Sequence, residues 1–129
     1  MYKINGKEYD CSVMMTLDVF NDKWKLSIIW HLLSGEKRFG ELHECIPETS
    51  QKTLTVKLRE LEKKRIITRE VYAEVPLKVV YSLTSIGENL RPLFKNMYQW
   101  GVEYATIHGE VTDDSAYDEE VLRKKLGGL

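Results

Sequence analysis

Hydrophobic residues recur with helical spacing through the first half of the chain. Residues 12–20 predict a short helix and residues 23–33 a longer, buried one, because their apolar side chains return every third or fourth position. Asp22 precedes the second helix and is a suitable cap for it. Residues 39–46 predict a third, short helix that ends at Pro47.

Residues 50–65 carry the clearest helical pattern. Leu54, Leu58 and Leu61 fall on one face, and Ser50 is expected to cap the helix by accepting a bond from a free main-chain N–H group. The opposite face is polar or small, with Lys52, Thr55, Val56, Arg59 and Lys63. This helix therefore has one side for a core and another for solvent or a partner.

The periodicity then changes from helical to alternating. Residues 66–72 and 78–84 are rich in β-branched and aromatic side chains, and the loop 73–77 joins them. Pro76 suits this loop, since proline cannot donate to a strand ladder. The segment predicts a β-hairpin.

A last long helix is expected over residues 85–107. Ser85 and Glu88 have the spacing of a capping box, and Pro92 predicts a kink because it lacks an N–H group. Apolar residues alternate at intervals of three and four, which suits packing against another helix: Ile86, Leu90, Leu93, Met97, Trp100, Tyr104 and Ile107. Residues 110–129 follow as an acidic tail, expected to be a short helix or partly disordered.

Charge is unevenly distributed along a chain that is nearly neutral. The 129 residues have a formal charge of −1, 43% hydrophobic residues and 30% charged residues, as in an ordinary globular domain. Residues 50–69 nevertheless carry a net charge of +5, whereas residues 108–129 carry −3. We therefore expect one domain over residues 1–109, with a candidate basic face, and a separate tail over 110–129.

Targeting and cysteine signals are weak. The N-terminus is polar, and no apolar run reaches the length of a membrane span. Two cysteines do not make a disulfide framework. These observations predict a cytoplasmic protein without a membrane partner.

The order of the elements predicts a mainly α (α+β) fold, a winged helix-turn-helix. A short helix, a turn and a capped basic helix are followed directly by a hairpin that can serve as the wing. An α-helix fits the major groove of DNA, where glutamine suits adenine, arginine suits guanine, and methyl groups suit thymine. The candidate groove residues are Ser50, Gln51, Lys52, Thr53, Thr55, Val56 and Arg59. Lys57, with Lys63 and Lys64, is better placed for phosphates or solvent, and Lys78 for flanking DNA at the wing.

Several stretches together resemble the HxlR-type winged helix-turn-helix transcriptional regulators. They are residues 11–13, 16–19, 23–26, Ile28, 38–42, 50–55, 58–62, 74–84 and Gly87, in order and with matching spacing. The resemblance implies a homodimer built from the first and last long helices, which regulates transcription by binding double-stranded operator DNA. It also implies that residues 50–59 lie in the recognition helix, that Lys78 is the basic wing residue, and that Arg38 contacts the DNA backbone.

Cys11 stands where several members of that family sense oxidants or electrophiles. Such chemistry needs a thiolate, which a helix N-terminus favours and the neighbouring Asp10 opposes. Many relatives have proline after this cysteine, whereas this chain has Ser12. The alternative role for Cys11 is packing at the dimer interface, and packing is also expected for Cys45.

Two other functions remain open from the sequence. The module could serve protein–protein contact alone, or it could be a repressor that responds to a ligand or metal without cysteine sensing. Trp24, Trp30 and Trp100 are expected to pack, although they could line a pocket for an unknown effector; His43 and Cys45 alone are a weak metal signal. The sequence contains no phosphate-binding, nucleophile-elbow or metalloprotease motif. A non-enzyme without cofactor or metal is therefore expected.

Overall fold

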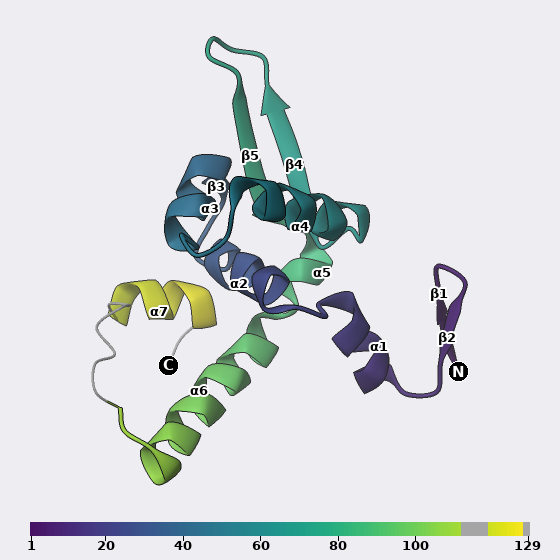
Figure 1. The fold of residues 1–129 in the computed structure, drawn as a ribbon, viewed down its shortest axis with the longest axis vertical. Helices are drawn as coiled ribbons and strands as arrows, with labels where there is room; N and C mark the ends of the chain where they lie inside the picture. Colours follow the sequence, from purple (N-terminus) through teal and green to yellow (C-terminus); the bar gives the residue numbers. More distant parts are fainter. Residues whose placement is uncertain (112–118, 128–129) are drawn as a thin grey trace.

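The computed structural model describes residues 1–111 and 119–127. In chain order the elements are β1 (Tyr2–Ile4), β2 (Lys7–Tyr9), α1 (Ser12–Val19), α2 (Lys23–Leu32), β3 (Lys37–Arg38), α3 (Phe39–Cys45), α4 (Gln51–Lys63), β4 (Ile67–Tyr72), β5 (Lys78–Leu83), α5 (Ser85–Glu88), α6 (Arg91–His108) and α7 (Glu119–Leu126). Figure 1 shows α2, α3 and α4 at the centre, with the β4–β5 hairpin projecting on one side and α6 on the other.

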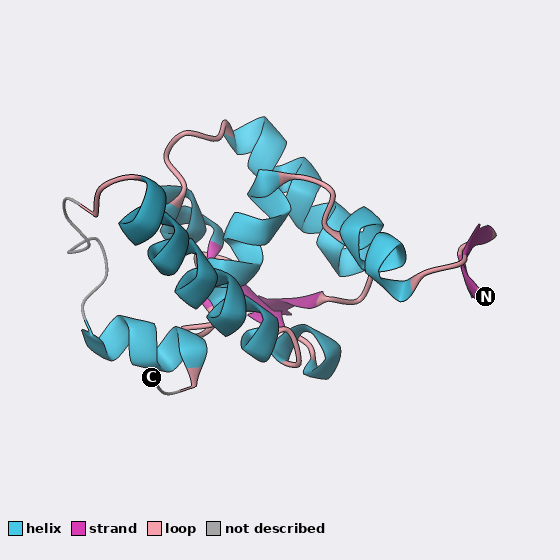
Figure 2. Cartoon of the chain, turned by 90° about the horizontal axis from the view of Figure 1, so that it is seen from below, coloured by secondary structure: helices cyan, strands magenta, loops and turns pink. Residues whose placement is uncertain are grey.

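The central helices enclose the hydrophobic core. Ile28 and Ile29 of α2, Leu42 of α3, and Leu54 and Leu58 of α4 are at most 1% exposed and belong to one cluster. The Asp22 side chain accepts a bond of 2.9 Å from the main-chain N–H of Lys25, which confirms the predicted cap of α2. Figure 2 shows the chain from below, with helices around the strands.

The predicted hairpin is present, and it belongs to a three-stranded antiparallel sheet. Strands β4 and β5 pair from Ile67 opposite Leu83 to Tyr72 opposite Lys78. The two-residue strand β3 pairs with the other edge of β5, so that the order is β3-β5-β4. Strand β3 was not predicted, because two residues are too few to show a period of two.

A second hairpin, β1–β2, precedes α1 and was also not predicted. Asn5 and Gly6 form its turn with φ values of 49° and 80°, and Ile4 pairs with Lys7. Asparagine followed by glycine is favoured in such turns because both central residues need positive φ. Lys7 and Tyr9 attach the hairpin to α1 through the Asp18 carboxylate, at 2.7 Å and 2.6 Å.

The last predicted helix is divided into α5 and α6. Pro92 lies in the first turn of α6, where its missing N–H costs no helical hydrogen bond. In place of the expected kink within one helix, one helix ends and a second begins just before this proline. The predicted Ser85–Glu88 capping box is wrong: Thr84 caps α5 by accepting from the Gly87 N–H at 3.2 Å. Glu88 instead pairs with Arg91 at 2.5 Å.

Helix α7 packs against the body of the protein. Leu122, Lys125 and Leu126 are buried. The Arg91 Nη1 group donates to the main-chain oxygens of Lys125 at 2.7 Å and Leu33 at 3.0 Å, so α6 joins the end of α7 to the end of α2. The expectation for the tail also covers residues 112–118, which lie outside the described residues.

Among the helices the structure describes, none is long and apolar enough to cross a membrane.

Candidate nucleic-acid interface

Helix α4 is fixed to the body by its inner face and its N-terminal cap. The Ser50 Oγ accepts from the Thr53 N–H at 3.0 Å, which confirms the predicted cap. Leu54, Leu58 and Leu61 are at most 1% exposed, so the leucine face is the core face as predicted. Burying three leucines stabilises the helix by several kcal/mol, of order 2 kcal/mol each.

The opposite face of α4 is open to solvent. Gln51, Lys52 and Arg59 are exposed, and Val56 is 40% exposed. Together with Thr55 and Phe39 of α3, these side chains line a shallow hollow of about 600 Å³. The structure therefore gathers most of the predicted groove residues on one surface.

Phe39 was not among the predicted interface residues. It is partly buried against the core, and it also lines the same hollow as Arg59. Thr53 is partly buried, and its Oγ1 accepts from the Ser50 hydroxyl at 3.0 Å. The side chains of Ser50 and Thr53 therefore stabilise the start of α4.

Lys57 of α4 and Lys64, directly after it, already have partners within the chain. Lys57 Nζ lies 3.0 Å from the Asp22 carboxylate, on the side of α4 that faces the start of α2. Lys64, which was expected to face phosphates or solvent, is exposed and also has hydrogen-bond partners within the chain. Its Nζ donates to the main-chain oxygens of Val19 at 2.9 Å and Asp18 at 3.2 Å, where it satisfies carbonyls at the end of α1.

A second ion pair links α4 to α2. Lys25 is only 3% exposed, and its Nζ lies 2.7 Å from the Glu60 carboxylate. With the Lys57–Asp22 pair, it joins the middle of α4 to the first turn of α2. The orientation of α4 therefore depends on charge pairing as well as on leucine packing.

The wing and the segment before α3 carry the remaining predicted contacts. Arg38 is exposed at the end of β3, and its guanidinium lies 3.8 Å from the Glu74 carboxylate. The Lys78 Nζ lies 5.1 Å from the centre of the Tyr72 ring. Val75 and Leu77 are fully or mostly exposed at the tip. Lys78 at the start of β5 and Arg38 on the neighbouring strand β3 are thus the basic residues near the apolar tip of the wing.

Cys11 lies at the N-terminus of α1 and is exposed. The main-chain amides of Met14 and Val13 lower the pKa of the Cys11 thiol, because they stabilise the thiolate at the start of the helix. Cys45 is exposed as well, so the expectation that it packs in the core is wrong. It is the last residue of α3.

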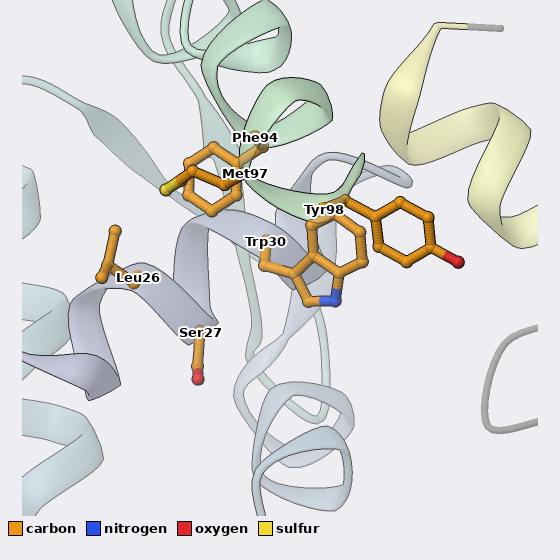
Figure 3. Close-up of a pocket in the computed structure, with 6 residues that line it drawn as sticks. All are labelled: Leu26, Ser27, Trp30, Phe94, Met97 and Tyr98. Atoms are coloured by element: carbon orange, nitrogen blue, oxygen red, sulfur yellow. The ribbon is translucent and has the colours of Figure 1, made fainter. Parts of the chain in front are cut away.

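Trp30 packs between two aromatic rings of α6. Its ring centre lies 6.2 Å from that of Phe94 and 6.1 Å from that of Tyr98, both nearly parallel. Figure 3 shows these rings with Leu26, Ser27 and Met97 around a hollow of about 290 Å³ between α2 and α6. The expected packing role of Trp30 is observed at the edge of this hollow.

The other two tryptophans differ in burial. Trp24 packs against the core, whereas Trp100 is 64% exposed and stacks on Tyr104. His43 donates from Nε2 to the main-chain oxygen of Thr49 at 2.9 Å. Within residues 1–111 and 119–127, no group of three or more His, Cys, Asp and Glu side chains could hold a metal ion.

Exposed apolar side chains form an apolar surface over α1 and α6. It consists of exposed side chains from both helices: Val13, Met14, Leu17, Leu93, Met97, Trp100, Tyr104 and Ile107. Between the two helices is a hollow of about 520 Å³. These are largely the residues in which the sequence showed spacings of three and four. Exposed apolar surface of this extent is typical of an interaction site.

A helix-turn-helix followed by a wing, with one polar helix face left open, defines a DNA-binding transcription regulator. The chain belongs to the HxlR-like helix-turn-helix family, whose model matches residues 19–108. The HTH-type transcriptional regulator YdeP of Bacillus subtilis is 47% identical over 94 residues, which cover 73% of each chain.

Two solved structures of redox regulators have the same fold. The reduced form of HypR superposes with a TM-score of 0.72 at 43% identity, over 75% of this chain and 96% of that one. The reduced form of YodB from B. subtilis gives a TM-score of 0.65 at 35% identity, over 82% of this chain and all of that one. HypR is also known in an oxidised form, and YodB in diamide-treated and quinone-bound forms.

Proposed function

We propose that the protein binds operator DNA as a homodimer, with α4 in the major groove and the β4–β5 wing on flanking DNA. One observation carries this proposal: the polar face of α4 is exposed while its leucine face is buried. Gln51, Lys52, Val56 and Arg59 then face base edges, and Thr55 lies beside them. Arg38 and Lys78 contact phosphates or the minor groove on either side.

The proposed dimer uses the apolar surface over α1 and α6. Leu17 is 56% exposed and Trp100 64% exposed in the single chain, so a partner subunit would remove much apolar area from water. Residues 1–109 then form the DNA-binding and dimerisation unit, and residues 110–129 the tail attached to it. The two copies of α4 would meet half-sites with centres ~34–36 Å apart, or a multiple of that distance.

Cys11 is proposed as the control point of this dimer. Its thiol is exposed, its lowered pKa favours the reactive thiolate, and it stands on the helix that carries part of the dimer surface. The redox-regulator relatives HypR and YodB support the same assignment. Modification of Cys11 would change the packing of α1 and so the spacing of the two recognition helices.

The relatives are transcription regulators, which supports a non-enzymatic role. The single most informative experiment is selection of bound DNA from a random pool, using the dimeric full chain. We expect a palindromic consensus whose binding weakens as salt rises. Failure of a properly dimeric sample to retain any DNA at low salt would contradict the proposal and favour a module for protein contact.

A matched pair tests the cysteine. Mild oxidation with diamide should release the wild-type protein from its site, whereas Cys11→Ser should stay bound. Cys45→Ser is the control, because that thiol is also exposed, and it should respond like the wild type. Equal release of wild type and Cys11→Ser would exclude Cys11 as the sensor.

A further inference from the structure

A hollow of about 400 Å³ lies where the N-terminal hairpin, α1 and the α4–β4 junction meet. Its wall is mostly apolar and comes from four elements or their ends, with Ile4, Met15, Ile66 and Ile86 as the main contributors. This volume lies within the range of small-molecule sites. The matched family region begins at residue 19, so the hairpin and most of α1 that form this hollow lie outside it.

The polar rim of the hollow has one excess positive charge. Lys7 and Asp18 form an ion pair of 2.7 Å, so their charges compensate each other. Lys64, also on the rim, donates to two main-chain oxygens. No ion pair found in the described part of the chain includes Lys64.

The surroundings of Lys64 disfavour its charge. Burial, and then repulsion by Lys25, lower the pKa of Lys64, and the carboxylates of Glu60 and Asp18 compensate this only in part. The Lys64 ammonium has carbonyl acceptors but no carboxylate in contact, and an anion at its open side would stabilise its charge. The hollow therefore combines an apolar body with a cationic rim.

We propose that this hollow binds a small hydrophobic anion, a compact ring or branched chain that carries one carboxylate. The carboxylate pairs with Lys64, and the apolar part lies against Ile66 and Ile86. The occupant is chosen by charge complementarity, since a neutral ligand would leave the excess charge of the rim uncompensated. This site is separate from both the α4 surface and the hollow between α1 and α6.

Lys64 connects the site to the rest of the molecule. It directly follows α4, and its ammonium holds the last carbonyls of α1. A bound carboxylate competes for these hydrogen bonds and so loosens the contact between α1 and α4. Only this effect on DNA rests on the function proposed above, because binding of the anion itself does not require DNA recognition.

The test uses the full chain and the dye 8-anilino-1-naphthalenesulfonate, an aromatic system with one anionic group. We expect saturable fluorescence with one site per chain. The dye should be displaced by 2-naphthoate but not by uncharged 2-naphthalenemethanol. Failure to saturate, or equal displacement by both compounds, would overturn the proposal.

Two variants and a control locate the dye. Lys64→Met should weaken binding about tenfold through loss of the charged partner, and Ile86→Trp should weaken it as much by filling the hollow. Ile86 is 62% exposed, so that change leaves the core intact, which circular dichroism verifies. Leu93→Ser, at the separate α1–α6 hollow, should leave affinity unchanged. Unaltered binding in both variants, or loss in Leu93→Ser instead, would show that the dye binds elsewhere and that the proposal is wrong.

The DNA experiment is read independently of the dye. If the chain binds DNA but not the dye, the proposed function stands and the proposed anion site is refuted. If the chain binds the dye with the expected pattern of variants but binds no DNA, the anion site stands and the proposed function is refuted.

Discussion

Lys125 and Trp30 are in direct contact although 95 residues separate them. The Lys125 Nζ donates to the main-chain oxygen of Trp30 at 3.0 Å and lies 4.9 Å from the centre of the indole ring. The lysine is only 1% exposed. It reaches a carbonyl in the last turn of α2. The contact holds α7 against the same helix that carries the core isoleucines.

The first prediction concerns the pH dependence of this contact. Burial, together with Lys37, lowers the pKa of Lys125 to about 8. In the unfolded chain Lys125 has its ordinary pKa near 10.5. Between pH 8 and 10.5 the unfolded chain therefore binds more protons at Lys125 than the folded chain does, and the free energy of unfolding rises with pH in that window. Urea unfolding should show this rise for the wild type and a smaller one for Lys125→Met.

Lys124→Met is the matched control for that measurement. Lys124 lies on the same helix with a side chain that is 60% exposed. Its removal should leave the rise with pH unchanged, and an equal reduction in both variants would contradict the assignment to Lys125.

The second prediction concerns His31. Burial, then Lys125 and Lys37, lower the pKa of His31 to about 4. The unfolded chain therefore takes up a proton near pH 6.5 that the folded chain resists, and stability should fall as the pH drops from 6.5 towards 4. We expect a loss of roughly 1–2 kcal/mol, after allowance for solvent exposure. His31→Gln should reduce this slope in urea unfolding, and an unchanged slope would contradict the assignment to His31.

The third prediction concerns Arg59, which is exposed on the outer face of α4. If it reads a base, Arg59→Ala should lower operator affinity by about 1–3 kcal/mol and relax the preference at one position. Its thermal stability should stay near that of the wild type, because surface substitutions usually cost little. Fluorescence anisotropy with the selected site and single-base variants measures both effects. Unchanged affinity and preference would remove Arg59 from the interface.

The fourth prediction compares two lysines of α4. Lys52 is exposed, whereas Lys57 is held 3.0 Å from Asp22. Lys52→Ala should therefore reduce the slope of log affinity against log salt by about 0.9, the value for one phosphate contact. Lys57→Ala should reduce this slope less, because its charge is already paired. The reverse order would mean that the Lys57–Asp22 pair opens on DNA.

The fifth prediction concerns Gly87 in α5. A Cβ atom at this position would lie 2.4 Å from the main-chain oxygen of Ile66, a contact that only a backbone shift relieves. Gly87→Ala should therefore destabilise the protein by about 1–3 kcal/mol in urea unfolding. Gly101→Ala is the control, since a Cβ there meets nothing within 4 Å, and it should stabilise α6 by about 0.5–1 kcal/mol. A stabilising effect of Gly87→Ala would contradict the described packing.

Local signals predicted the core elements well. The leucines of α4, the caps Asp22 and Ser50, and the β4–β5 pairing all follow from side-chain periodicity and capping chemistry. The Asn5-Gly6 turn carried a signal of equal strength, which the sequence analysis did not use. Its strands are only three residues each, too short for alternation to be recognised.

Tertiary contacts account for what the sequence could not provide. Lys64 and Lys57 are residues of the type that binds phosphates, but the end of α1 and the start of α2 supply partners for them within the chain. Likewise, the sequence alone predicts that Lys125 is a surface residue, whereas in the fold it contacts the end of α2 and the Trp30 ring. Such partners are distant in sequence, so periodicity carries no information about them.

The division between α5 and α6 has a consequence for the length of DNA that a dimer can span. Asn89 and Leu90 separate the two helices, and Pro92 has no N–H to continue the hydrogen-bond ladder. The direction of α6 therefore depends on side-chain contacts such as those of Arg91 and Phe94. In a dimer joined through α6, small changes at this joint would be magnified at the distant α4 helices. One protein could then fit operators whose half-sites differ slightly in spacing.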